Sequence, residues 1–97
     1  MSEWISSSVV ITHDLGLHAR PSVKLTKLAK GFASSLEIGG SSEGPWIDAK
    51  SIVKVMAMKA KQHSTLHVRA SGGDAGAAVA AIVDLVTRDF DDAGHGV

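Results

Sequence analysis

The order in which two apolar periodicities follow each other along the chain limits its fold more than any other feature. Apolar residues at helical spacing mark two stretches, Leu25–Phe32 and Val79–Val86. A β-branched run marks Ile5–Thr12, and apolar and polar residues alternate in Thr65–Ala70, which is typical of a half-buried strand. Because segments of the two kinds interleave, the pattern predicts an α+β domain of two layers.

Shorter signals complete the expected order, β-α-β-β-α-β-α. Pro21 suits the first turn of a helix because that turn needs no N–H, and Gly31 is a natural helix stop. Ser51 and Asp74 are placed to cap the second and third helices. We expect strands over residues 5–12, 33–38, 46–49 and 65–70, and helices over residues 18–31, over 51–58 and from 74 onward. Helices would cover one face of the sheet, and the other face, with Arg69, would meet water.

The size of the chain, 97 residues and 10.1 kDa, leaves room for one hydrophobic core and a single domain. We expect the core to span about residues 5–90 and the tail 91–97 to fray. Cysteine is absent, which excludes disulfides, cysteine-ligated zinc and thiol nucleophiles. We see no signal peptide and no apolar run of about 20 residues, so we expect a cytoplasmic protein without direct membrane insertion.

The net charge is zero, but it is unevenly distributed. Residues 1–73 hold nine Lys and Arg against five Asp and Glu, a net charge of +4, and residues 74–97 hold one Arg against five Asp, a net charge of −4. A nucleic-acid binder usually shows excess positive charge and aromatic residues on an exposed sheet face. The two Trp and two Phe all lie outside the expected fourth strand. We therefore expect no nucleic-acid partner, although a basic patch could face an acidic protein.

One of the five histidines has chemically informative neighbours. No pair has HExxH spacing and few carboxylates lie close by in the sequence, so we expect no metal ion. His18 stands at the start of the first helix, where backbone N–H groups lack partners and the helix dipole attracts an anion. Arg20 could add a guanidinium fork for a phosphate. This arrangement suits a nucleophile that accepts and releases a phosphoryl group, although a capping or partly buried histidine fits the same pattern.

The residues around His18 resemble a known signature. Gly16-Leu17-His18-Ala19-Arg20-Pro21 is similar to the active-site motif of HPr, the histidine-containing phosphocarrier of the bacterial phosphoenolpyruvate-dependent phosphotransferase system (PTS). Lys50–Met56 resembles the second motif of that family, which surrounds a regulatory serine, and Ala29–Phe32 falls where the family ends its first helix. The resemblance covers roughly residues 5–90.

The resemblance implies both a fold and a function. The fold would be an open-faced β-sandwich, a four-stranded antiparallel sheet covered on one face by three helices. His18 would be phosphorylated on Nδ1 by enzyme I and would pass the group to an enzyme IIA-type acceptor, while Arg20 steadies the phosphate. The protein would be a monomeric carrier rather than an enzyme, with no cofactor.

The resemblance also implies a docking surface for these partners and a regulatory site. The docking candidates are Leu17, Lys24, Lys27, Ile52, Lys54, Val55 and Met56. The apolar residues of the second helix could equally be core, above all Val53 and Met56. Ser51 could be a plain N-cap or the target of HPr kinase/phosphorylase, and a protein that regulates by binding alone is the alternative function. A sugar-transport branch and a non-transport regulatory branch of the PTS both stay open.

Four departures from the family pattern are visible. Ser22 follows Pro21 where alanine is common. Leu15 replaces an Asn or Ser that could donate a hydrogen bond to the phosphate. Gln62-His63 replaces a glycine turn, so we expect a non-glycine residue with positive φ there. The turn at residues 39–44 is about two residues longer than usual.

Overall fold

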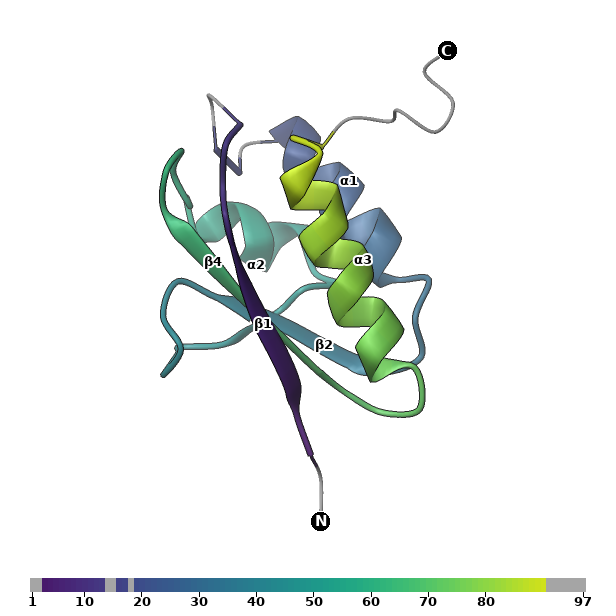
Figure 1. Ribbon diagram of the computed structural model, residues 1–97. Coiled ribbons are helices and arrows are strands. Elements are labelled where there is room, and N and C mark those ends of the chain that lie inside the picture. The colour runs from purple at the N-terminus through teal and green to yellow at the C-terminus, as the bar shows by residue number, and fades with distance from the viewer. Residues whose placement is uncertain (1–2, 14–15, 18, 91–97) are drawn as a thin grey trace.

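The computed structural model describes residues 3–13, 16–17 and 19–90 of the chain (Figure 1). Within them the elements follow the predicted order β-α-β-β-α-β-α. The strands are β1 (Ile5–Val10), β2 (Ser35–Gly39), β3 (Ile47–Asp48) and β4 (Thr65–Ser71). The helices are α1 (Ala19–Ala29), α2 (Ile52–Ala57) and α3 (Ala75–Thr87). The expected fraying of residues 91–97 lies outside the described residues.

The four strands form one antiparallel sheet in the order β1-β4-β2-β3. Ala70 of β4 lies opposite Ile5 of β1 on one side and Leu36 of β2 on the other, which fixes the register of the three long strands. β1 and β3 are the edge strands, and β3 pairs with β2 through only two residues. The last strand of the chain is therefore inserted in the middle of the sheet.

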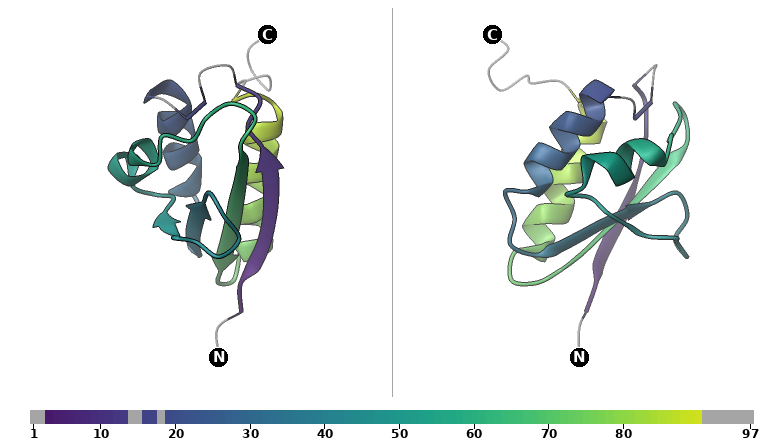
Figure 2. Two further views of the ribbon diagram at one scale, coloured as in Figure 1. Left: turned by 90° about the vertical axis from the view of Figure 1, so that its left-hand side faces the viewer. Right: turned by 180° about the vertical axis from the view of Figure 1, so that it is seen from behind.

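The helices lie on one face of this sheet, as Figure 2 shows from two sides. α3 packs along β1 and β4, and α1 packs against both α2 and α3. The fold expected from the resemblance, an open-faced α+β sandwich, is confirmed. No helix within the described ranges is long and apolar enough to cross a membrane.

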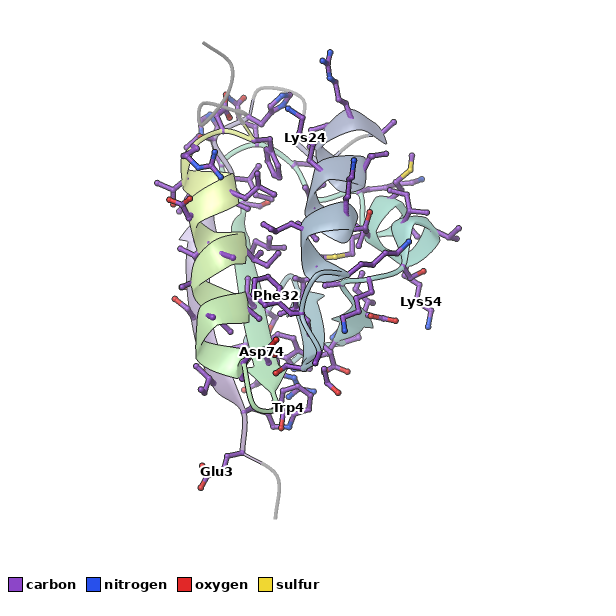
Figure 3. All side chains as sticks on the ribbon, turned by 90° about the vertical axis from the view of Figure 1, so that its right-hand side faces the viewer. Glu3, Trp4, Lys24, Phe32, Lys54 and Asp74 are labelled. Atoms are coloured by element: carbon purple, nitrogen blue, oxygen red, sulfur yellow. The ribbon has the colours of Figure 1, made fainter. Side chains whose placement is uncertain are left out.

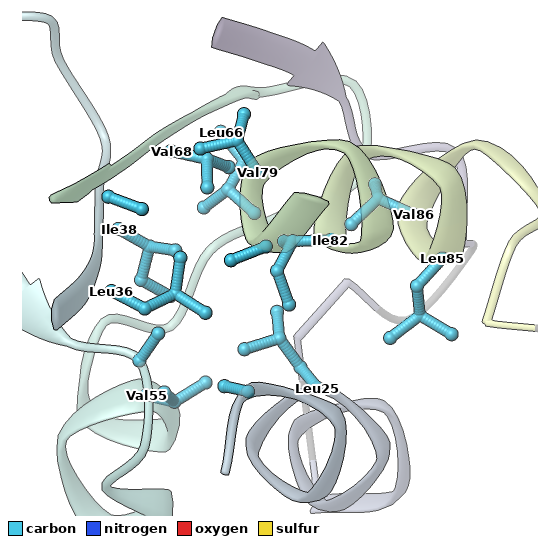
Figure 4. Packing of buried hydrophobic residues seen from close by; sticks show 14 of the residues in the cluster. Leu25, Leu36, Ile38, Val55, Leu66, Val68, Val79, Ile82, Leu85 and Val86 are labelled. Atoms are coloured by element: carbon cyan, nitrogen blue, oxygen red, sulfur yellow. The ribbon is translucent and has the colours of Figure 1, made fainter. Parts of the chain in front are cut away.

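The core fills the space between the sheet and the helices (Figure 4). In β4 the even-numbered residues from Leu66 to Ala70 are fully buried, as the alternation predicts. Leu25 of α1, Val55 of α2 and Ile82 of α3 are also fully buried and belong to the same cluster. Each helix is therefore anchored by apolar side chains that face the sheet, which holds α1 and α2 in place beside each other.

The first strand ends two residues earlier than predicted, at Val10. Ile11 still bonds to the turn before β4, because its N–H donates to Ser64 O at 2.9 Å and its carbonyl accepts from His63 N at 2.7 Å. His63 adopts φ 73°, so the expected positive φ at a non-glycine residue in this turn is confirmed. The turn before β4 therefore ends the pairing between β1 and β4.

Asp74 has a different role from the predicted cap. It precedes α3, but its side chain makes no capping bond to that helix. Its carboxylate accepts instead from Ala33 N at 3.0 Å, from Ser34 N at 2.9 Å and from the Ser34 hydroxyl. These bonds hold the pKa of Asp74 below its ordinary value, the Ser34 hydroxyl contributing most. Asp74 therefore fastens the start of α3 to the loop before β2.

The outer face of the sheet is less open to water than expected. The guanidinium of Arg69 lies over the rings of both Trp4 and Trp46, 4.2 Å from each centroid. Glu37 on the neighbouring strand accepts from Arg69 at 2.7–2.8 Å. Both tryptophans are distant from Arg69 in the chain, so this contact joins β1 to the loop before β3 across the sheet.

Candidate functional site

His18 lies outside the described residues, and the location of its imidazole stays a prediction. The residues on both sides of it are described. Leu17 precedes it, and α1 begins at Ala19 directly after it. Any chemistry at His18 therefore takes place between a loop and the N-terminal end of an 11-residue helix.

The loop before His18 is fixed by a carbonyl group from a distant turn. Leu17 N donates to Ala60 O at 2.9 Å, and Gly16 N donates to His13 O at 2.9 Å. Gly16 has φ +66°, and a Cβ added to it would lie 2.3 Å from Ala60 O. Only glycine fits this close approach, so the glycine of the predicted motif has a steric explanation.

The turn that supplies Ala60 is itself bound to the end of β1. Lys59 and His63 have positive φ, 52° and 73°, on either side of Ala60. The Gln62 side chain donates to Thr12 O at 3.2 Å. Residues 59–64 therefore hold the loop before His18 in place. Sequence reasoning missed this role because no local pattern marks a backbone carbonyl.

A second hydrogen bond joins the loop before His18 to α1. The hydroxyl of Ser22, which is fully buried, donates to Leu17 O at 3.3 Å. With the Leu17 N–H held by Ala60, both backbone groups of Leu17 have partners. The serine departs from the alanine that is common after the motif proline, and it contributes this bond.

Arg20 lies in the first turn of α1 and is exposed. The first turn holds no acidic residue, so nothing in it neutralises the positive end of the helix dipole. The adjoining Pro21 is buried and starts the helix without needing an N–H partner. The first turn of α1 is therefore a positive, solvent-facing surface directly after residue 18.

The two lysines of α1 that were expected in the docking surface differ in exposure. Lys27 is exposed in the last turn of α1. Lys24 is half-buried, and its ammonium donates to Phe90 O at 2.8 Å (Figure 3). Lys24 therefore joins α1 to Phe90, just beyond α3, and only part of its side chain is open to a partner.

The residues of α2 divide between core and surface in a way that corrects two predictions. Val55 is fully buried, so it belongs to the core and cannot line a docking surface. Val53 and Met56, for which a core role seemed at least equally fitting, are 74% and 40% exposed. Ile52 is half-buried and Lys54 exposed.

Leu17 also has to be reassigned, since it is only 2% exposed and packs in the core. It anchors the loop from within. The exposed docking candidates in the described residues are therefore Lys27, Lys54 and Met56, with Val53 beside them.

Ser51 occupies the N-cap of α2. Its hydroxyl oxygen accepts from Lys54 N at 3.4 Å, and its extended φ and ψ are those of an N-cap residue. The capping role is confirmed, and the side chain is half-buried. Residues 3–13, 16–17 and 19–90 hold no group of three side chains that could bind a metal ion.

Comparison with known proteins identifies the family. The family model "PTS HPr component phosphorylation site" matches residues 5–88. A phosphocarrier protein HPr from Cupriavidus necator is 38% identical over 86 residues, which cover 89% of this chain and 94% of that protein. A phosphocarrier protein NPr from Escherichia coli is 31% identical over 88 residues, with 91% and 97% covered.

Solved structures agree with this assignment. An HPr from Thermoanaerobacter tengcongensis superposes with a TM-score of 0.81 at 28% identity, covering 96% of this chain and 99% of that one. A histidine-containing phosphocarrier protein from Mycoplasma gives a TM-score of 0.79 at 34% identity, with 91% and 99% covered. The chain therefore belongs to the HPr family of phosphocarrier proteins of the phosphotransferase system.

Proposed function

We propose that His18 is the phosphoryl acceptor of this carrier, charged by phospho-enzyme I and discharged to an enzyme IIA-type protein. In each transfer the phosphorus–nitrogen bond on the donor breaks as a new bond forms to the acceptor atom. On arrival at His18 that atom is Nδ1 of the imidazole. The protein carries the group and does not turn over a substrate by itself.

The observation that carries this proposal is the positive first turn of α1 beside position 18. Its backbone N–H groups lack intrahelical partners, and Arg20 is exposed with no acid in the same turn. Such a surface stabilises the charge of a transferring phosphoryl group without a covalent bond to it. A solvent-facing site also lets the group leave again, which a carrier needs.

The loop anchors give the site its rigidity. Leu17 is held at its N–H by Ala60 and at its carbonyl by Ser22, so the chain enters position 18 from a fixed point. Transfer between two proteins depends on the alignment of the reacting atoms, and misplacement by about 1 Å can cost about 100-fold in rate. We infer that these anchors keep the nucleophile ready for in-line attack.

We place the partner-binding surface on the exposed part of α1 and α2. Arg20, Lys27 and Lys54 offer positive charge, and Val53 and Met56 offer exposed apolar area. An acidic partner with an apolar centre would match this combination. Both enzyme I and the acceptor would use it, since the same histidine must reach each of them.

Ser51 is a second proposed phosphorylation site, used by an HPr kinase/phosphorylase. Its half-buried hydroxyl is at the start of α2, so a phosphate would add negative charge close to Lys54. The added charge would weaken the attraction to an acidic partner. Ser51→Asp is therefore expected to slow phosphorylation by enzyme I, with Ser51→Ala as the matched control.

A regulatory branch is the alternative to sugar transport. Its support is that relatives named NPr match this chain at 31% and 34% identity, beside the relatives named HPr. Both branches use the same chemistry at His18. They would be separated by the acceptor, because a transport branch passes the phosphoryl group to a sugar-specific enzyme II.

The experiment is an incubation with phosphoenolpyruvate, magnesium and a bacterial enzyme I, followed by intact-mass measurement before and after acid. We expect one acid-labile phosphate, absent in His18→Ala and present in the matched control His67→Ala. Arg20→Ala should keep transfer but slow it by about 10- to 100-fold. A phosphorylated His18→Ala protein would contradict the site assignment. An unchanged rate of phosphorylation in Arg20→Ala would mean that Arg20 has only a structural role.

A further inference from the structure

The loop between β2 and β3 and the C-terminal half of α2 line a partly open pocket whose apolar walls lie outside the proposed partner-binding surface. Its volume is about 530 Å³, within the range of about 300–1,000 Å³ that small-molecule sites occupy. The loop between β2 and β3, which supplies part of the lining, runs at the left of Figure 1. The walls used in the argument come from Ser41, Pro45, Ile47, Lys54, Ala57 and Met58.

The walls are apolar except at the rim. Pro45, Ile47, Ala57 and Met58 contribute carbon and sulfur surface, which favours an apolar body in the pocket. Lys54 is the one lining residue with a charged side chain. Its ammonium has no acceptor within bonding distance among the described residues, and it points away from the body of the domain in Figure 3.

Ser41 adds a second polar group at the rim. Its hydroxyl oxygen accepts from Glu43 N at 3.1 Å, which leaves the hydroxyl hydrogen without an acceptor in the described part of the chain. A cation and an O–H donor at one rim both attract negative charge. The polar groups therefore select an anion, and the walls select an apolar molecule.

The loop that forms one wall is held in place rather than free. Gly44 N donates to Ser41 O at 3.0 Å and closes a turn. Gly44 has φ +89°, and the next residue but one, Trp46, is stacked on Arg69 at 4.2 Å. These contacts preform the pocket, so little ordering has to occur when a ligand enters.

We propose that this pocket binds a small organic anion, an aromatic carboxylate whose ring packs on Pro45, Ile47 and Met58 and whose charge pairs with Lys54. The site goes beyond the phosphocarrier function and needs neither His18 nor a phosphoryl group. One wall of the pocket is formed by the loop between β2 and β3.

The test is a titration of the uniformly ¹⁵N-labelled full chain with 1-naphthoate, followed by amide chemical shifts. A ligand of this size in a partly open pocket should bind with Kd on the order of 1 mM. We expect saturable shifts at the amides of Ser41, Gly44, Ala57 and Met58. The neutral 1-naphthalenemethanol is the second probe, because it keeps the ring and lacks the charge.

Two variants with a matched control decide the result. Lys54→Met should weaken naphthoate binding by about twofold to fivefold, as expected for an exposed ion pair, and leave the neutral probe unchanged. Lys27→Met, an exposed lysine on α1, should change neither. Ala57→Phe should fill the pocket and abolish the binding of both probes.

Three outcomes would overturn the proposal. They are the absence of saturable shifts up to about 5 mM naphthoate, shifts that map away from the pocket, and equal weakening by Lys54→Met and Lys27→Met. None of them bears on phosphotransfer, which is measured separately.

Discussion

Replacing Gly16 with alanine tests whether the close approach to Ala60 positions the loop before His18. The added Cβ would lie 2.3 Å from Ala60 O, while real Cβ atoms practically never come closer than 3.0 Å. The difference between these two values means that the loop or the turn must move by at least about 0.7 Å. The obstacle is a backbone carbonyl, so no side-chain rotation can relieve it.

The magnitude follows from two costs. An L-residue in the left-handed region, as at φ +66°, costs roughly 1–2 kcal/mol. Displacing Ala60 O weakens its bond from Leu17 N, which is worth about 0.5–1.5 kcal/mol. We therefore expect Gly16→Ala to lower the free energy of unfolding by about 2–3 kcal/mol. Phosphorylation by enzyme I should slow by about 10- to 100-fold, since the entry to position 18 shifts.

Urea unfolding followed by circular dichroism measures the first effect, and the initial rate of phosphate incorporation measures the second. Gly73→Ala is the matched control, because a Cβ there meets nothing within 4 Å. It should alter stability by no more than about 0.5 kcal/mol. If Gly16→Ala matched Gly73→Ala in both assays, the steric reasoning would be refuted.

Three further predictions concern stability. His63→Gly should raise the free energy of unfolding by about 0.5–1 kcal/mol, since φ 73° suits glycine. A decrease of this free energy in urea unfolding would contradict the prediction. Val55→Ala should cost about 2 kcal/mol, and its exposed neighbour on α2, Val53→Ala, at most about 0.5, both by chemical denaturation. The lowered pKa of Asp74 in the folded state means that the unfolded chain takes up its proton first, so stability falls as the pH drops from the ordinary carboxyl range towards that lower pKa. Asp74→Asn should flatten this acid loss in melting temperatures, and an unchanged pH slope would count against the bonds to residues 33 and 34.

The sequence allowed prediction of the elements because each has a local signal. The alternation in β4 and the stripe in α1 depend on neighbouring residues, and burial of Leu66 and Leu25 follows from them. α2 is different because six residues are too few to define a phase when most of them are apolar. Its two valines therefore exchanged places between core and surface relative to the prediction.

Contacts between distant residues were beyond the reach of sequence patterns. The family resemblance assigned Lys24 to a docking surface, yet its ammonium binds the carbonyl of Phe90. Asp74 has the residue type and position of a cap, and its bonds go to a loop 40 residues away. In both cases the local pattern gave the element correctly, and the tertiary contact determined the role of the side chain.

The same limit applies to the candidate site. The motif from Gly16 to Pro21 predicts where it lies, and α1 begins at Ala19, directly after the histidine of the motif. The groups that hold it, Ala60 O and the Ser22 hydroxyl, carry no signal in the sequence, because any residue supplies a carbonyl and serine is common in helices.

The stack on Arg69 determines what an optical experiment on this protein can report. The chain has two tryptophans and no tyrosine, and both indole rings lie on that one guanidinium. Intrinsic fluorescence therefore monitors a single spot on the outer face of the sheet, the face opposite the helices. A fluorescence melt and a far-ultraviolet dichroism melt of this chain are thus independent probes of its two layers. Their coincidence would show that the domain unfolds in one step.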